Sequence, residues 1–495
     1  MKPKSEIILS SINRESRVAL LEEDRLVEFH IERAEKKGLV GRIYKGKVQN
    51  VVNGLRGAFV SLGLRKNGFL PLVEIPEYEI FEPELEIEPS SKKRGKKISI
   101  VEGQEILCQI VKEPFGEKGA RLTSFVYLPG RYMVYFPNAD RIGISRRIQE
   151  NRNRNRLRDI ARKIRKENVG LIIRTAAETA QETQIRNEYS MLENTWQQIQ
   201  RNSNGAVVPA LLYDEPSIAV KLVRDLFNPD TKNLFVDNYD CYNEIIEYLD
   251  LTAPNLCQKV HHYQSDVPIM EHFKIETQLA QALERKLWLK SGGFITVDQT
   301  EALVAIDVNT GRSAKEEDPE RLIFSTNLEA ASEIARQIRL RDLSGLIIID
   351  FIDMQDPKNT ERVITELKLC LENDRAKADF SRMSRFGLLE MTRERTRPGL
   401  IYTLCELCPT CDGLGRIYSR AETGLKIERA ILSKIETLKG RKIILLVAPH
   451  MHNFLTQEWI ERLGGFVKQN ALSLEIKMDI GLTPAECKIL TDYKI

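Results

Sequence analysis

Two apolar runs rich in β-branched residues, VAIDVNTG and LIIIDFIDM, constrain the fold of this chain more than any other feature of its sequence. Such runs are typical of strands that are buried on both faces in the middle of a sheet. The stretch between them, TNLEAASEIARQIRLRDL, has the periodicity of an amphipathic helix and is long enough for a crossover connection. The pattern predicts an α/β unit with two neighbouring parallel strands and with Asp307 and Asp350 together at one sheet edge.

The two aspartates suggest a metal site. Two carboxylates this close repel each other unless a cation lies between them, and Mg²⁺ or Mn²⁺, with oxygen ligands and retained waters, suits them best. Asn309 lies two residues after Asp307, on the same side of an extended chain, where it could orient a ligand water. The alternative is that both aspartates are capping or turn residues, which are common at strand ends. Asp353 is a weaker candidate because it is one pleat out of phase with Asp350.

Other catalytic chemistries fit this chain poorly. It has six histidines, and none is near these strands in sequence. It contains no G-x-x-x-x-G-K-[ST] phosphate loop, no G-x-S-x-G elbow and no H-E-x-x-H helix. An acidic site without histidine suits a metal-activated water that attacks a phosphodiester. We therefore expect hydrolysis that leaves a 5′-phosphate and a 3′-hydroxyl.

The rest of the chain predicts a mixed α+β multidomain protein, since 495 residues exceed what one core usually serves. The first forty residues alternate apolar and polar positions, which predicts a small antiparallel sheet. From Leu39, short strands and Gly-rich turns predict a barrel, interrupted by a polar segment at 76–97 that we expect to be a loop. A strand at 131–136, a basic helix, the strand VGLIIRTAAE and a long polar helix follow. Residues 272–289 predict one helix that leads through SGG into the strand FITVD.

The predicted barrel carries two phenylalanines, Phe59 and Phe69, among several Lys and Arg residues. OB-type barrels bind single-stranded nucleic acid by stacking bases on such aromatics along a basic groove. The alternative is that both side chains belong to the barrel core, which is the usual place for isolated aromatics. The basic neighbours and the Gly-rich turns favour contact with RNA.

Charge is concentrated in one segment. The net charge is only +3, but residues 141–166 hold eleven Lys or Arg against two acids. A block this basic attracts polyanions through counterion release, although a helix here could simply present a solvated face. The segment therefore favours nucleic acid as a partner without establishing it.

Three of the eight cysteines cluster, at 405, 408 and 411, and the other five are scattered as in a chain with ordinary buried thiols. In CPTCDGLG, Cys408 and Cys411 flank a tight turn and could supply half of a tetrahedral Zn²⁺ site. Because the chain has no C-x-x-C apart from this one and the overlapping CELC at 405–408, the other two ligands are expected from a second copy, which predicts a zinc-bridged homodimer. Cys405 is an alternative ligand. A redox role fits less well, because the motif does not open a helix after a strand.

The sequence gives no sign of a membrane or an export route. Its N-terminus lacks the apolar stretch of a secretion signal, and no apolar run approaches the roughly 20 residues that a bilayer span requires. We expect a cytoplasmic protein without a membrane partner.

These features together resemble the ribonuclease E/G family over nearly the whole chain. The stretches that carry the resemblance are STNLEAASEIARQIRLRDLSGLIIIDFIDM, SRFGLLEMTRER, CPTCDGLG, GFITVDQTEALVAIDVN and GISRRI. The chain is more similar to the family's short, ribonuclease G type, because it ends without an extended Pro- and Arg-rich tail.

The resemblance assigns roles to individual residues. It implies that Asp307 and Asp350 bind magnesium with Asn309 as their partner, and that Cys408 and Cys411 form the zinc link between protomers. It places further residues on the path of the RNA: Phe59, Phe69 and Lys118 in the channel of the OB domain, and Arg174, Thr175, Val134 and Arg146 in a pocket that senses a 5′-monophosphate. A guanidinium that forks onto phosphate oxygens suits that last role, although Arg174 alone would otherwise suggest a surface salt bridge.

The resemblance also implies a domain order. The expected parts are an RNase H-like subdomain at 1–38 and 215–280, an OB-fold barrel at 39–125, a 5′ sensor at 126–214, a DNase I-like catalytic subdomain at 281–400, a zinc link at 401–416 and a small α/β domain at 417–495.

The function that follows is cleavage of single-stranded, A/U-rich RNA, with a preference for 5′-monophosphorylated substrates. The resemblance further implies ribosomal RNA processing and messenger RNA decay, carried out by a zinc-linked dimer or a dimer of dimers. Two other classes stay open at this point. One is a non-catalytic RNA-binding protein in which the aspartates are structural, and the other is a metal-dependent DNA nuclease, since a fold does not fix the sugar.

Overall fold

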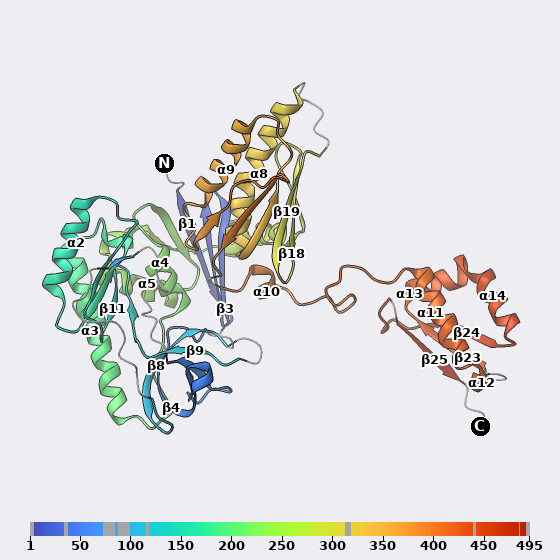
Figure 1. Ribbon diagram of the computed structural model, residues 1–495, viewed down its shortest axis with the longest axis horizontal. Coiled ribbons are helices and arrows are strands. Elements are labelled where there is room, and N and C mark those ends of the chain that lie inside the picture. Colours follow the sequence, from blue (N-terminus) through green and yellow to red (C-terminus); the bar gives the residue numbers. More distant parts are fainter. Residues whose placement is uncertain are drawn as a thin grey trace. The chain divides into compact units, whose positions relative to one another are not determined.

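The computed structural model describes residues 4–33, 38–72, 85–87, 100–114, 118–311, 318–395, 397–438, 442–484 and 486–491. The chain forms two compact units, Met1–Leu400 and Ile401–Ile495. The predicted mixed α+β class is confirmed, since the described residues form five sheets and both units also contain helices (Figure 1). Among the helices in the described ranges, none combines the length and the apolar character that a membrane span requires.

The first sheet joins the start of the chain to residues more than two hundred positions later. The predicted antiparallel strands are present as β1 (Ser5–Ile12), β2 (Glu15–Glu22) and β3 (Arg25–Arg33). Strands β15 (Thr231–Val236) and β16 (Val260–His262) extend the sheet in parallel, in the order β16-β15-β1-β2-β3. The accompanying helices are α4 (Ile218–Leu226), α5 (Tyr239–Thr252), a 3-10 turn at Pro254–Lys259, α6 (Ile269–His272) and α7 (Ile275–Leu283).

Residues from Ile43 onward form the predicted closed barrel. Its strands are β4 (Ile43–Val52), β5 (Gly57–Ser61), β6 (Gly68–Pro71), β9 (Arg121–Thr123) and β8 (Glu105–Lys112). The barrel closes because β4 pairs with both β5 and β8. Its core contains Val48, Val60, Leu70, Cys108, Ile110 and Leu122, and β14 (Ala210–Tyr213) adds to the edge of β4.

The predicted loop at 76–97 lies largely outside the described residues. The prediction is wrong for its three described residues, because β7 (Leu85–Ile87) is a short strand that pairs with β12 (Ile142–Ser145). Alternation in LEI was too short to reveal a strand from the sequence.

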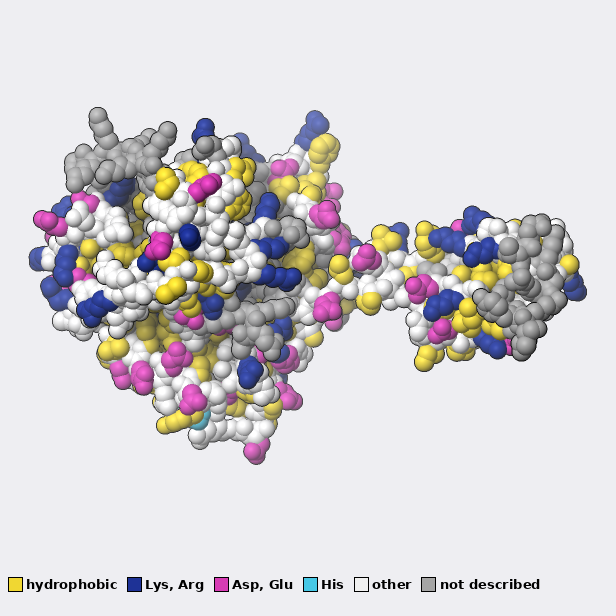
Figure 2. All heavy atoms as spheres, turned by 90° about the horizontal axis from the view of Figure 1, so that it is seen from below, with side chains coloured by type: hydrophobic (Ala, Val, Ile, Leu, Met, Phe, Trp, Pro, Cys, Tyr) yellow, Lys and Arg dark blue, Asp and Glu magenta, His cyan; other side chains and the backbone are white. Residues whose placement is uncertain are grey.

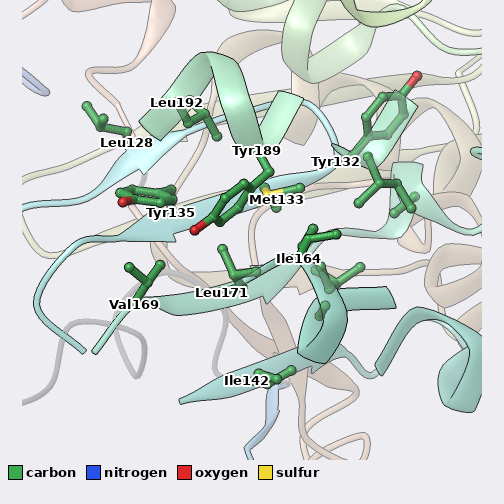
Figure 3. Close-up of a cluster of buried hydrophobic side chains, with 14 of the residues drawn as sticks. Leu128, Tyr132, Met133, Tyr135, Ile142, Ile164, Val169, Leu171, Tyr189 and Leu192 are labelled. Atoms are coloured by element: carbon green, nitrogen blue, oxygen red, sulfur yellow. The ribbon is translucent and has the colours of Figure 1, made fainter. Parts of the chain in front are cut away.

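The third sheet has the order β10-β11-β13-β12-β7 and is covered by two helices. Its remaining strands are β10 (Leu128–Pro129), β11 (Met133–Phe136) and β13 (Gly170–Ile173), and the helical segments are α2 (Asn151–Ile164), a 3-10 turn at Thr175–Ala177 and α3 (Glu182–Gly205). Figure 3 shows the apolar core in which Tyr135 of β11 packs edge-on against Tyr189 of α3, with ring centroids 5.7 Å apart.

The basic helix α2 is amphipathic, which reconciles the two interpretations of this segment. Leu157, Ile160 and Ile164 are buried in the core, while Arg152 and Lys163 are exposed. Figure 2 shows Lys and Arg side chains together at the left end of the larger unit, where α2 and α3 lie in Figure 1. The helix therefore has a packing role and also presents positive charge to solvent.

The fourth sheet carries the predicted acidic pair. Its strands are β17 (Lys286–Trp288), β18 (Phe294–Gln299), β19 (Leu303–Asn309), β20 (Gly345–Asp350), β22 (Leu388–Arg393) and β21 (Ala378–Phe380), in that spatial order. Helix α8 (Pro319–Arg341) is the predicted crossover between β19 and β20, and α9 (Pro357–Leu371) packs beside it (Figure 1).

Two expectations for this sheet are wrong. Its central strands are not buried on both faces: residues alternate between buried and partly or fully exposed positions along β19, because only one face meets the apolar core shared with α8 and α9. The predicted helix over 272–289 is also divided, into α6, α7 and strand β17. A hairpin through SGG pairs β17 with β18, and sheet pairing overrides the helical periodicity there.

The second unit contains a small three-stranded sheet in the order β24-β23-β25. Its elements are α10 (Leu400–Leu404, beginning at the boundary), α11 (Arg420–Leu432), α12 (Ile435–Leu438), β23 (Lys442–Val447), α13 (Pro449–Asn453), a π-helical turn at Phe454–Glu458, α14 (Ile460–Gln469), β24 (Ser473–Met478) and β25 (Cys487–Thr491).

Candidate functional site

The acidic pair lies on the open face of the fourth sheet. Strands β19 and β20 run parallel, and Asp307 and Asp350 are register partners at their carboxyl ends. Both side chains are exposed, whereas their neighbours Ile306 and Ile349 point into the core at 1% and 0% exposure. The prediction that the two aspartates share one sheet edge is therefore confirmed in its geometry.

The connection between the strands fixes this register. Helix α8 begins with Pro319, after Asp318, whose carboxylate accepts hydrogen bonds from backbone N–H groups of the first turn. It ends at Asp342, which has a left-handed φ of 53° and turns the chain into β20. Residues at the two helix ends thus fix where α8 begins and ends, and this places β20 beside β19.

The two carboxylates repel each other. Burial, the charge of Asp307 and the charge of Asp353 together raise the pKa of Asp350. Asp353 was a weaker candidate by its phase, yet its carboxylate is close enough to act on Asp350. A site that disfavours its own negative charge in this way is suited to a cation.

Asn309 lies beside Asp307 on the same face of β19. Its Nδ2 donates a hydrogen bond to Asp307 Oδ2 at 2.7 Å. The amide thereby holds the carboxylate in one orientation and leaves Oδ1 for another ligand. Whether Asn309 also orients a ligand water stays a prediction.

The donor set fits a hard cation that keeps much of its water shell. Within the described ranges, no group of three or more Asp, Glu, His or Cys side chains is placed to hold a metal by itself. Two carboxylates supply fewer ligands than the six that Mg²⁺ takes, and Mg²⁺ commonly keeps several waters and is bound by one or two carboxylates together with phosphate. The residues present therefore suit Mg²⁺ or Mn²⁺ at an open site.

Sequence reasoning missed a residue that positions the acidic pair. Asn327 is fully buried in α8, where its Nδ2 donates to Ile352 O at 2.8 Å and its Oδ1 accepts from Ile352 N at 3.2 Å. This amide clamp fixes the chain two residues after Asp350. The available signal was a polar residue on the apolar side of an amphipathic helix, where a buried amide needs partners.

The barrel phenylalanines lie outside the barrel core. Phe59 of β5 and Phe69 of β6 are register partners, their rings meet edge-on with centroids 5.6 Å apart, and both are partly exposed. Gly57 leaves room for this pair, because a Cβ there would lie 2.3 Å from Phe69 Cε2. Lys118 is exposed on the segment just before β9, which pairs with β6 at Phe69. The structure brings the two rings together and places Lys118 on an adjacent segment.

The residues predicted to sense phosphate lie mainly at the ends of two parallel strands. Arg146 follows β12 and Arg174 follows β13, and Thr175 Oγ1 and Ser145 Oγ share a hydrogen bond of 3.2 Å that joins the two ends. Val134 is separate from this polar group, since it is 8% exposed in an apolar cluster with Ile172.

Arg174 also has a structural partner. Its Nη1 donates to Gly130 O and to Asp225 Oδ1, both at 2.7 Å. Although burial opposes ionisation, Arg174 and Arg224 lower the pKa of Asp225 to about 2. The salt bridge considered from the sequence is therefore present. Within the part of the chain that the structure describes, Nε and Nη2 of Arg174 have no hydrogen-bond partner.

The segment that holds Arg174 is anchored by a buried acid that the sequence did not reveal. Glu188 of α3 is 1% exposed and accepts hydrogen bonds from the backbone N–H groups of Arg131, Tyr132 and Met133 at 2.5, 2.7 and 3.2 Å. Burial raises the pKa of Glu188 in spite of these donors. Nothing distinguishes this Glu from its polar neighbours in the helix.

The cysteine cluster lies in an irregular segment of the second unit. Cys408 is exposed, Asp412 N donates to Cys408 O at 2.8 Å, and Gly415 N donates to Cys411 Sγ at 3.3 Å. Backbone N–H groups of Cys411 and Thr410 lower the pKa of Cys408. Such a turn suits a thiolate metal ligand. Cys405 is exposed just after α10, outside the turn.

Comparison with known proteins gives a consistent result. Residues 127–396 match the model of the "Ribonuclease E/G family", and residues 39–113 match that of the "S1 RNA binding domain". The chain is 35% identical to Ribonuclease G of Haemophilus influenzae over 476 residues, which cover 96% of this chain and 95% of that protein. It is 36% identical to Ribonuclease G of Escherichia coli K12, with 92% and 93% coverage, and 36% identical to Ribonuclease E of H. influenzae, with 95% and 50% coverage.

Proposed function

Because the chain belongs to the ribonuclease E/G family, we propose that it is an endoribonuclease that cuts single-stranded RNA at a Mg²⁺-dependent site formed by Asp307 and Asp350. The proposal rests most directly on one observation: the two aspartates are register partners on parallel strands and face the same open surface. Their mutual repulsion gives a cation a reason to bind, and the open surface gives a strand of RNA access.

In the proposed mechanism, Asp307 and Asp350 hold Mg²⁺, or Mn²⁺ in its place, through carboxylate oxygens. When bound, such an ion lowers the pKa of a water and stabilises the charge that develops on the phosphate. Asn309 keeps Asp307 oriented through its 2.7 Å hydrogen bond to Oδ2, which would leave Oδ1 to hold the ion. Asn327 fixes the chain after Asp350. Water adds to phosphorus as the P–O3′ bond breaks; the water loses one proton and the leaving 3′-oxygen gains one, which gives a 5′-phosphate and a 3′-hydroxyl.

The barrel supplies the proposed channel for the RNA. Phe59 and Phe69 offer partly exposed ring faces for stacking of bases, and Lys118 offers a cation to the backbone. Stacking tolerates any base, so we ascribe the preference for A/U-rich RNA to unpaired structure in the substrate. Maturation of ribosomal RNA and decay of messenger RNA in the cytoplasm are the cellular roles that we propose.

A 5′-monophosphate is proposed to bind near Arg174, Thr175 and Arg146, with Val134 as part of the pocket wall. Arg174 uses Nη1 for its structural bonds, which leaves Nε and Nη2 for phosphate oxygens. Those two donors form one side of the guanidinium fork, the geometry that binds an oxyanion in a bidentate manner. Arg146 is exposed and adds positive charge at the neighbouring strand end.

Two copies of the chain are proposed to share a Zn²⁺ ion through Cys408 and Cys411 of each copy. The support is the turn around the thiols and the lack of a separate C-x-x-C elsewhere in the sequence, since the overlapping Cys405-Glu-Leu-Cys408 shares Cys408. Two such dimers could associate further into a tetramer.

The activity is tested with a short, A/U-rich, 5′-monophosphorylated single-stranded RNA, incubated with Mg²⁺, without divalent ion, and with Mg²⁺ restored. The proposal expects internal cuts only when Mg²⁺ is present, and fragments that a 5′-phosphate-dependent exonuclease degrades. Fragments that end in a 2′,3′-cyclic phosphate would contradict hydrolysis by water. Binding without cleavage under all three conditions would favour the non-catalytic alternative.

A further inference from the structure

An aromatic pair, with one ring exposed and the other partly exposed, lies on the same sheet face as the acidic pair. Trp288 of β17 is 67% exposed, and its ring meets that of Phe294 of β18 edge-on, with centroids 5.4 Å apart. Leu287 and Ile295, the sequence neighbours of Trp288 and Phe294 on the same strands, point to the opposite face and belong to the core. A tryptophan that a strand presents to solvent beside a fully packed core contributes little to that core.

A lysine accompanies the two rings. Lys286 Nζ lies 4.1 Å from the ring centroid of Trp288 and 3.5 Å from that of Phe294. No carboxylate among the described residues lies within salt-bridge distance of Lys286, whose ammonium group instead contacts the two ring faces. Lys286, Trp288 and Phe294 together form what we term the aromatic platform.

Strand register places the platform next to the acids. Trp288 pairs with Phe294, and Phe294 pairs with Asn309, the hydrogen-bond partner of Asp307. In the neighbouring row of the sheet, Lys286 pairs with Thr296, and Thr296 pairs with Asp307. Because adjacent strands are about 4.8 Å apart, Trp288 and Lys286 are only about 10 Å from the strand that carries Asp307.

We propose that the aromatic platform stacks one base of the substrate strand close to the phosphate that is cut, while Lys286 contacts a neighbouring phosphate. This inference deepens the proposed function and rests on it. An exposed indole beside an unpaired cation matches the chemistry of a nucleotide, which has an aromatic face and an anionic backbone. Arg285, which precedes Lys286, and Asp298, at the far end of β18 from Phe294, are paired with each other at the surface and do not extend the apolar area. A nucleobase therefore fits the platform better than the broad apolar area of a protein interface.

Binding is measured first, apart from cleavage. The chain has three tryptophans: Trp196 is 7% exposed in a core, Trp459 is partly buried against Phe454, and Trp288 is 67% exposed. Quenching of tryptophan fluorescence by bound RNA would therefore come mainly from Trp288. In Mg²⁺-free buffer, the Asp350→Asn chain is titrated with a short single-stranded RNA. We expect clear quenching, which Trp288→Phe should remove while leaving affinity nearly unchanged, because phenylalanine can still stack. Trp288→Leu should weaken binding about tenfold.

A substrate series locates the base. Abasic nucleotides are placed one at a time around the cleavage site, and one position is expected to weaken binding about tenfold in the parent chain but not in Trp288→Leu. Such non-additivity identifies a direct contact. Tyr239→Leu is the matched control, because Tyr239 is a similarly exposed aromatic, at 61%, on helix α5, which accompanies the first sheet. This substitution should leave the RNA affinity unchanged.

The outcomes separate this inference from the proposed function. Quenching and non-additivity without any cleavage by the wild-type chain would support the platform and overturn the nuclease proposal. Normal cleavage, with Trp288→Leu equal to wild type on every substrate, would overturn the platform alone. A change in particle mass on Trp288→Leu, with RNA affinity unaltered, would also overturn it and identify the face as a contact between copies.

Discussion

Asp307 and Asp350 are register partners on neighbouring parallel strands, forty-three positions apart in sequence and side by side on one open sheet face. The pKa of Asp350 is raised by the loss of solvent around its carboxylate in this position and by the charges of Asp307 and Asp353. Two carboxylates that repel each other in this way are expected where a cation binds between them.

Mg²⁺ binding and stability should depend on pH through Asp350. A carboxyl whose pKa is raised in the folded state destabilises the fold while ionised, and this destabilisation disappears as pH falls through the raised pKa. Without Mg²⁺ at neutral pH, Asp350→Asn should therefore melt at a higher temperature than wild type, and the difference should shrink at acid pH. Added Mg²⁺ should stabilise wild type but not Asp350→Asn, by about 2.7 kcal/mol when the Mg²⁺ concentration is 100 times its dissociation constant. Calorimetry with and without Mg²⁺ measures this difference. Equal stabilisation of both chains would contradict this.

The barrel aromatics should contribute to RNA affinity. Phe59→Ala and Phe69→Ala should each weaken binding of single-stranded RNA by about 1–3 kcal/mol, because each removes a stacking face. Filter binding at fixed salt measures the effect, and circular dichroism checks that the barrel is folded. Leu55→Ala is a control, since Leu55 is 60% exposed on the barrel but offers no aromatic ring. Unchanged affinity in folded Phe variants would return both side chains to a packing role.

The dependence of the cleavage rate on the 5′ end of the RNA should require Arg174. Wild type is expected to cut 5′-monophosphorylated RNA faster than 5′-hydroxyl RNA, and Arg174→Lys should largely remove the difference, because lysine keeps the charge near Asp225 but loses the fork. Initial rates on the two substrates give the ratio. Arg162→Lys, on the exposed side of α2, should keep the wild-type ratio. A preference that survives in Arg174→Lys and in Arg174→Ala would place the sensor elsewhere.

The cysteine turn should control assembly. Cys408→Ser and Cys411→Ser should each convert a dimer into monomers, and wild type should contain about one Zn²⁺ per two chains, since each copy supplies two of four ligands. Sedimentation with metal analysis tests both statements. Cys405→Ser is the matched control, because Cys405 lies outside the turn and should not alter the mass. A zinc-free wild-type dimer would separate assembly from the thiols.

Much of this fold follows from patterns that the sequence displays directly. The strand–helix–strand unit around Asp307 and Asp350 could be predicted because a long crossover constrains two apolar runs to lie in parallel. The barrel could be predicted because glycines mark its turns. Strand β17 could not, since KLW continues the apolar spacing of the preceding helix and only its partner β18 makes it a strand.

Some residues of the candidate site could likewise be predicted from the sequence, and others could not. Residues whose chemistry is visible in a motif, such as Asp350 and Cys408, could be identified from the sequence. Asn327 and Glu188 could not, because an amide or a carboxylate in a helix is ordinary until the fold buries it against backbone groups. Trp288 was hidden for a related reason: its exposure depends on the strand assignment that the sequence did not reveal.

The most direct test of the central claim compares Asp350→Asn and Asp307→Asn with wild type, measuring both cleavage and affinity for the same 5′-monophosphorylated RNA in Mg²⁺. Asp379→Asn, an exposed aspartate on β21 of the same sheet, is the control. We expect each active-site variant to lose at least about 100-fold in cleavage rate and to keep its RNA affinity within about twofold of wild type. The control should cleave RNA at the wild-type rate. Cleavage that persists near the wild-type rate in both variants would contradict the account.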